Sequence, residues 1–102
     1  MSKVPVKISH NDTLMISDYS YEVTLEIKSM ISKVLGDHIE ELKGGALAFG
    51  ELWTQYKSDD LVIDVFFDEG SGYEVRCVNE KAFSSCLSFV SESKLFSIEE
   101  NT

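Results

Sequence analysis

The sequence predicts a single α+β domain, residues 1–102, in which an antiparallel β-meander packs against one or two helices. Three strand-like apolar runs follow one another in the second half of the chain, joined by short connections rich in turn-forming residues. Segments on either side of these runs place apolar residues at helical spacing instead. A chain of 102 residues, 43% of them hydrophobic, can bury one core and leaves no room for a second domain.

The N-terminal residues predict a β-hairpin. Val4–Ile8 and Leu14–Ile16 are largely apolar, and the polar segment SHND at 9–12 joins them.

A helix is predicted over residues 21–35. Its apolar residues recur at helical spacing at Ile27, Met30, Ile31, Val34 and Leu35. Apolar residues also alternate from Tyr19 to Ile27, so the first turn of the helix is less well defined than the rest. Gly36 is expected to end the helix, and Asp37 to cap a short second helix that reaches Leu42.

The meander is expected to begin after a break at Gly44-Gly45. Its three strands are Ala46–Tyr56, Leu61–Glu69 and Tyr73–Val78, and the connections are KSDD at 57–60 and GSG at 70–72. Asn79 is then a candidate N-cap of a C-terminal helix. The apolar positions of this helix are Ala82, Phe83, Cys86, Leu87 and Val90, and it continues to about residue 92. A last short strand, Leu95–Ile98, is expected to rejoin the sheet.

The strand at residues 61–69 raises a question because aspartates interrupt its apolar run. Side chains alternate between the two faces of a strand. One face therefore carries the core residues Leu61, Ile63, Val65 and Phe67. The other face carries Val62, Asp64, Phe66 and Asp68, and the neighbouring strands can add Glu51, Trp53, Gln55, Glu74 and Arg76.

This second face combines carboxylates with large aromatic side chains, which makes it a candidate binding surface. Aromatic anchors supply contact energy and charges supply steering. The candidate partner-binding residues are Glu51, Trp53, Asp64, Phe66, Asp68 and Glu74. The alternative interpretation is an ordinary solvated sheet face with polar alternation.

The charge balance indicates which partners fit. The chain carries 18 acidic against 9 basic residues, a net charge of -9, with Arg76 as its single arginine. Binding of phosphates depends on clustered Lys and Arg, so nucleic acid is not expected as a ligand. A basic partner protein is better matched, although acidity can also serve solubility alone.

Neither catalysis nor a metal or other cofactor is expected. His10 and His38 have no local nucleophile and no metal-ligand spacing, and no Ser or Gly motif of a known enzyme class is present. Cys77 and Cys86 fit no metal or redox spacing and are expected to be free thiols in the core. The start MSKVPVKISH lacks an apolar signal core and no apolar run is long enough to cross a bilayer, so we expect a cytoplasmic protein without membrane contact.

A small, acidic chain with the acidic-aromatic segments ELWTQY and LVIDVFFDE resembles bacterial immunity proteins of contact-dependent growth inhibition and bacteriocin systems. The resemblance implies a stoichiometric inhibitor, a monomer when free, that binds a cognate toxin with a basic nuclease domain and covers its cleft. Three alternatives remain open: a type III secretion chaperone, which would be a homodimer, a phage anti-defence protein that mimics the charge of nucleic acid, and a generic small housekeeping domain.

Overall fold

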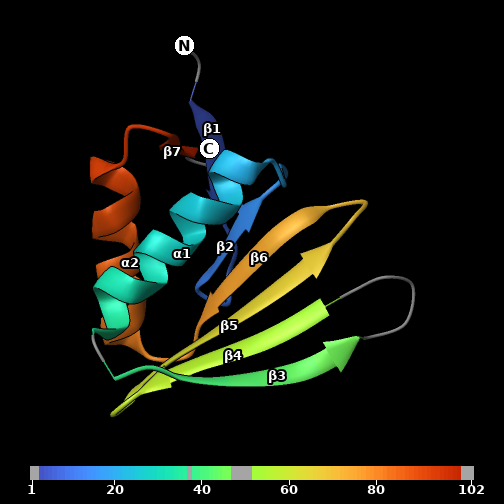
Figure 1. Ribbon diagram of the computed structural model, residues 1–102. Coiled ribbons are helices and arrows are strands. Elements are labelled where there is room, and N and C mark those ends of the chain that lie inside the picture. The colour runs from blue at the N-terminus through green and yellow to red at the C-terminus, as the bar shows by residue number, and fades with distance from the viewer. Residues whose placement is uncertain (1–2, 37, 47–51, 100–102) are drawn as a thin grey trace.

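The computed structural model describes residues 3–36, 38–46 and 52–99, which form a seven-stranded sheet and two helices in one compact domain (Figure 1). In chain order the elements are β1 (Val4–Ile8), β2 (Thr13–Ile16), α1 (Tyr21–Leu35), β3 (Glu40–Ala46), β4 (Leu52–Ser58), β5 (Leu61–Asp68), β6 (Gly72–Cys77), α2 (Glu80–Glu92) and β7 (Phe96–Glu99). The α+β fold class is therefore confirmed.

The strand order across the sheet is β3-β4-β5-β6-β2-β1-β7. The consecutive strands β3 to β6 form an antiparallel meander, and the β1–β2 hairpin joins it through an antiparallel pairing of β2 with β6. The last strand, β7, returns to pair with β1 in parallel. The first and last strands are thus neighbours at the sheet edge opposite β3.

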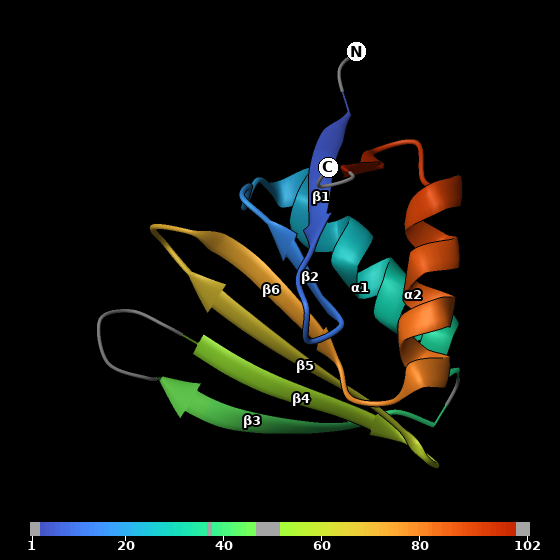
Figure 2. The ribbon, with the colours of Figure 1, turned by 180° about the vertical axis from the view of Figure 1, so that it is seen from behind.

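The two helices lie side by side on one face of the sheet (Figures 1 and 2). α2 is in contact with β5, β6 and β7, and α1 is in contact with β4. We call the helix side of the sheet the inner face and the opposite side the outer face. Within the described residues, no helix is long and apolar enough to cross a membrane.

The N-terminal hairpin and the first helix confirm the predictions. β1 pairs with β2 around a turn in which Asp12 takes a positive φ of 51°, a conformation that Asn and Asp tolerate better than most residues. α1 begins after Ser20, whose hydroxyl accepts a hydrogen bond from the Val23 backbone N–H at 3.4 Å. The helix ends at Gly36, where φ is 86°.

The prediction of a short second helix from Asp37 to Leu42 is wrong, because this part of the chain enters strand β3. The predicted strand Ala46–Tyr56 is also divided: Ala46 ends β3, β4 begins at Leu52, and residues 47–51 lie outside the described part of the chain. The Gly44-Gly45 pair does not break β3; the pairing with β4 continues across it with a shift of register between Lys43 and Gly45. Backbone pairing with β4 decides the structure here, since EELKGGA has no apolar periodicity of its own.

The C-terminal elements also follow the predictions, with one difference in chemistry. α2 begins after Asn79, yet the Asn79 side chain caps no helix N–H. Its Oδ1 instead accepts a hydrogen bond from the Val62 backbone N–H at 2.7 Å, so it joins the start of α2 to β5. β7 rejoins the sheet as expected, one residue later than predicted at each end.

The core lies between the inner face and the helices. In β5, Ile63 and Val65 are buried, and Leu61 is half-buried against the same core. Phe67, also half-buried, packs its ring against those of Tyr19 and Tyr73. This confirms the inner face predicted for β5. Cys77 and Cys86 are buried free thiols, as expected.

Candidate partner-binding surface

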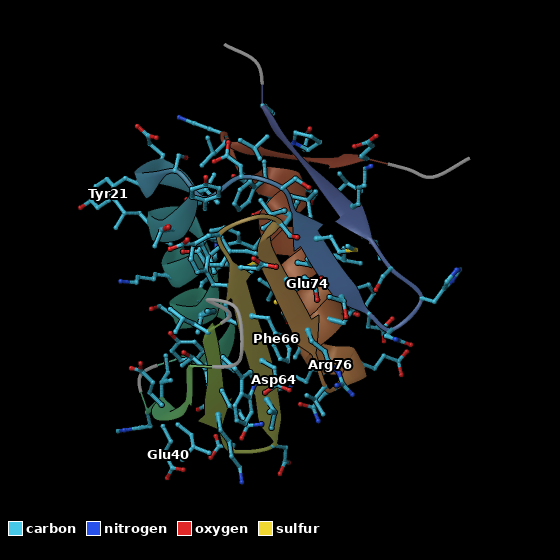
Figure 3. The ribbon with its side chains drawn as sticks, turned by 90° about the vertical axis from the view of Figure 1, so that its right-hand side faces the viewer. Tyr21, Glu40, Asp64, Phe66, Glu74 and Arg76 are labelled. Carbon is cyan, nitrogen blue, oxygen red and sulfur yellow. The ribbon has the colours of Figure 1, made fainter. Side chains whose placement is uncertain are left out.

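A row of side chains crosses the outer face from β4 to β2. Trp53 of β4 is paired with Phe66 of β5, which is paired with Glu74 of β6, and Glu74 is paired in turn with Met15 of β2. Register partners lie on the same face of a sheet, so these four residues are direct neighbours, and we call them the outer row. Figure 3 shows Phe66 and Glu74 on the near side of the sheet with α2 behind it.

The aromatic end of the outer row is a stacked pair. The rings of Trp53 and Phe66 have centroids 6.4 Å apart and planes inclined by 23°. Both residues are half-buried. The Trp53 Nε1 atom is buried and has no hydrogen-bond partner among the described residues. A buried N–H donor without an acceptor is unfavourable.

Asp64 lies on the outer face as predicted but is only 7% exposed. Its register partners are Gln55 on one side and Arg76 on the other. The Gln55 side-chain Nε2 donates a hydrogen bond to Asp64 Oδ1 at 2.9 Å. Asp64 is therefore a buried polar group satisfied within the sheet, and it offers a partner little direct contact.

Asp68 shapes the turn between β5 and β6. Its Oδ1 accepts a hydrogen bond from the Gly70 backbone N–H at 2.9 Å, and its Oδ2 accepts one from the Ser71 hydroxyl at 3.5 Å. Together with Phe66, Gly72 and Glu74 it borders a hollow of about 120 Å³. Such local side-chain bonds are typical of an aspartate at a turn, so the first role of Asp68 is structural.

The structure therefore brings Trp53, Phe66 and Glu74 together, while Asp64 and Asp68 serve the sheet itself. Glu51 lies outside the described residues. Met15 is 40% exposed and belongs to the same row, although the sequence pattern did not indicate it. No local signal could have found Met15, because its place depends on β2 pairing with β6 from the other end of the domain.

Charge on the outer face is mixed. Glu74 of the outer row and Arg76, two residues later on β6, are both exposed. Lys7 of β1 is paired with Met15 and so lies on the same face as the outer row. This face is less acidic than the sequence alone suggested, because the sheet order adds Lys7 to it and Asp64 is buried.

The described histidines and cysteines differ in their exposure to solvent. His10 and His38 are exposed, and no group of three or more His, Cys, Asp or Glu in the described ranges could hold a metal ion. The pKa of the Cys86 thiol is raised well above its usual value, first by its hydrogen bond with Cys77 and then by burial. A thiol held protonated in an apolar core is unreactive.

The fold and the outer row define a small α+β domain with an aromatic patch on the sheet face that its helices leave uncovered. No protein-family model, curated protein or solved structure matches this chain.

Proposed function

We propose that this protein is an immunity protein: a cytoplasmic, non-catalytic inhibitor that is monomeric when free and binds a cognate bacterial toxin one to one. The observation that carries the proposal is the stacked Trp53–Phe66 pair on the open face, with Glu74 beside it. Rigid aromatic side chains beside a charge are the usual anchors of a protein interface. An open sheet face suits a protein surface better than a small molecule, which favours a concave pocket.

The net charge of -9 supports a basic partner, and a toxin nuclease must be basic to grip phosphates. Opposite net charges accelerate encounter over a Debye length of about 8 Å at physiological salt. We therefore expect the association rate to fall as salt is raised, and the dissociation rate to change less. Because the outer face itself is mixed in charge, the steering comes from the whole chain rather than from Asp64 and Asp68.

The test is affinity purification of the tagged chain from its native host, with Trp53→Ala as the variant bait and Tyr21→Ala as the matched control. Tyr21 is an aromatic residue 75% exposed on α1, away from the outer row. The wild type and Tyr21→Ala should retain the same basic protein, and Trp53→Ala should lose it. Truncating a central aromatic anchor commonly costs about 2 kcal/mol or more in affinity, which is about thirtyfold in Kd.

The captured protein is then expressed alone, where it should arrest growth and degrade nucleic acid, and an equimolar amount of the chain should abolish both effects. A captured protein without toxicity would contradict the proposal, as would a folded Trp53→Ala variant that still inhibits fully. A free chain that is a stable homodimer by sedimentation would favour the secretion-chaperone alternative instead.

A further inference from the structure

The hollow of about 120 Å³ at the end of the β5–β6 hairpin has a simple geometric origin. Two neighbouring register pairs border it, Phe66 with Glu74 and Asp68 with Gly72. All four positions are on the outer face, because register partners and residues two apart on a strand share a face. Gly72 has no side chain, so the other three side chains surround the place of a missing fourth. We call this space the turn hollow.

The turn hollow is a fixed feature of the hairpin. Gly72 cannot be replaced by a larger residue without strain, because its φ is 94° and an added Cβ would lie 2.2 Å from the Ile16 backbone oxygen. The Asp68 carboxylate is held by the Gly70 N–H at 2.9 Å and by the Ser71 hydroxyl at 3.5 Å. A site that is already formed loses less conformational entropy on binding than a flexible one.

The walls of the turn hollow combine an aromatic ring with two carboxylates. Phe66 supplies the ring, which is also stacked with the ring of Trp53. Glu74 supplies one carboxylate from the neighbouring strand (Figure 3), and Asp68 supplies the other. A carboxylate has about four lone-pair sites, so Asp68 retains acceptor capacity beyond its two bonds within the turn. In the part of the chain that the structure describes, no lysine or arginine borders the hollow.

The size and the charge of the turn hollow select its occupant. Sites for small molecules have volumes of about 300 to 1,000 Å³, so this hollow holds the end of one side chain rather than a whole ligand. Calcium prefers 6 to 8 oxygen ligands, and the described ranges contain no group of three or more His, Cys, Asp or Glu that could hold a metal ion. An arginine guanidinium fits both kinds of wall, because it is positive, stacks on aromatic rings and donates hydrogen bonds to carboxylates.

We propose that the turn hollow binds an arginine side chain of the partner protein. The guanidinium plane stacks on the Phe66 ring, and its N–H groups donate to the Glu74 and Asp68 carboxylates. The inference rests on the proposed function, since it takes the outer row as the docking surface for a basic toxin. It adds a division of roles: the aromatic pair supplies contact area, and the turn hollow recognises one positive side chain.

The first test is a nuclear magnetic resonance titration of the full chain with Nα-acetyl-arginine methylamide. The control is the corresponding citrulline compound, which has nearly the same shape and no charge. The arginine compound should shift the backbone amide signals of Gly72 and Glu74, with a Kd at least about tenfold lower than that of the citrulline compound. The corresponding lysine compound should bind about threefold more weakly than the arginine compound, because an ammonium group does not stack on the ring as a guanidinium does.

Three variants locate the binding of the arginine compound. Glu74→Gln keeps the shape but removes the charge, and should weaken binding at least about fivefold. Phe66→Leu keeps an apolar side chain but removes the ring, and should weaken binding about threefold. Glu69→Gln is the matched control: Glu69 is an exposed acid beside Asp68 that does not border the hollow, so this change should alter Kd by less than about twofold. Circular dichroism checks that each variant is folded.

Several outcomes would overturn the inference. Equal binding of the arginine and citrulline compounds would do so, as would arginine binding that survives Glu74→Gln in the folded variant. Calcium chloride is titrated in parallel. If calcium, but not the arginine compound, shifted the signals of Gly72 and Glu74, the hollow would be a metal site and the inference would be wrong.

The same variants separate this inference from the proposed function. In the complex with the captured toxin, Glu74→Gln should raise Kd at least about fivefold and Glu69→Gln should not. If the chain neutralises the toxin and Glu74→Gln leaves Kd unchanged, the proposed function stands and the arginine inference is wrong. If the arginine compound binds the turn hollow but the captured protein is not toxic, the hollow remains an arginine site and the immunity function is wrong.

Discussion

The face assignment of β5 gives the sharpest test of the structure, through the substitution Ile63→Ala. Ile63 is fully buried in the middle of the central meander, between Tyr56 of β4 and Cys77 of β6. The change removes three carbon atoms, and at about 0.8 kcal/mol per buried methylene the lost transfer free energy is about 2.4 kcal/mol. A residual cavity of about 50 Å³ would add about 1.2 kcal/mol at about 24 cal/mol per Å³.

We therefore expect the free energy of unfolding to fall by about 2.4 to 3.6 kcal/mol. A domain of this size is stable by only about 5 to 15 kcal/mol, so the loss is easy to measure. Urea denaturation followed by circular dichroism and by the fluorescence of Trp53, the single tryptophan, gives the value directly.

The matched control is Val62→Ala, one residue earlier on the outer face, where the side chain is half-buried and the loss should stay below about 1 kcal/mol. If Ile63→Ala were nearly silent while Val62→Ala destabilised the protein strongly, the inner and outer faces of β5 would be exchanged, and the outer row would be part of the core.

Three further predictions concern single residues. Gly72→Ala should destabilise the protein by at least about 1 to 3 kcal/mol in thermal unfolding, because its φ is 94° and an added Cβ would lie 2.2 Å from a backbone carbonyl oxygen of β2. Gly70→Ala is the control and should be nearly neutral, because the atom nearest to its added Cβ would be 3.6 Å away. Asn79→Ala should lower the free energy of unfolding by about 1 to 3 kcal/mol, because a backbone N–H of β5 loses its acceptor. Asn79→Ser, although serine is a good N-cap, should not restore this stability. Full rescue by serine would show instead that helix capping is the role of this residue. Burial first, and then the negative charge of Glu41, raise the pKa of the Tyr56 hydroxyl. The stability that this hydroxyl contributes is therefore present below its unfolded pKa of about 10 and is lost as the pH rises through its folded pKa. Urea titrations across this pH range should show a steeper loss of unfolding free energy for the wild type than for Tyr56→Phe.

The elements that could be predicted are those whose own residues favour them. α1 has a continuous apolar stripe and ends at a glycine with positive φ, so its bounds of 21–35 follow from local spacing. The strands β5 and β6 alternate around the GSG turn, and this alternation also assigns Ile63 to the core and Phe66 to the outer face. Burial of Cys77 and Cys86 follows in the same way, from apolar positions on a strand and on a helix.

The remaining features depend on partners distant in the sequence. β3 is a strand because β4 offers it a backbone edge, although its own residues, EELKGGA, favour neither a strand nor a buried helix. Met15 joins the outer row because β2 pairs with β6, and nothing near Met15 specifies that pairing. Asp64 is buried because Gln55 and Arg76 lie on either side of it in the assembled sheet. Local sequence specifies periodicity and turns, whereas strand order and the solvent exposure of a side chain are set by hydrogen bonds and contacts across the sheet, which form only when distant segments meet.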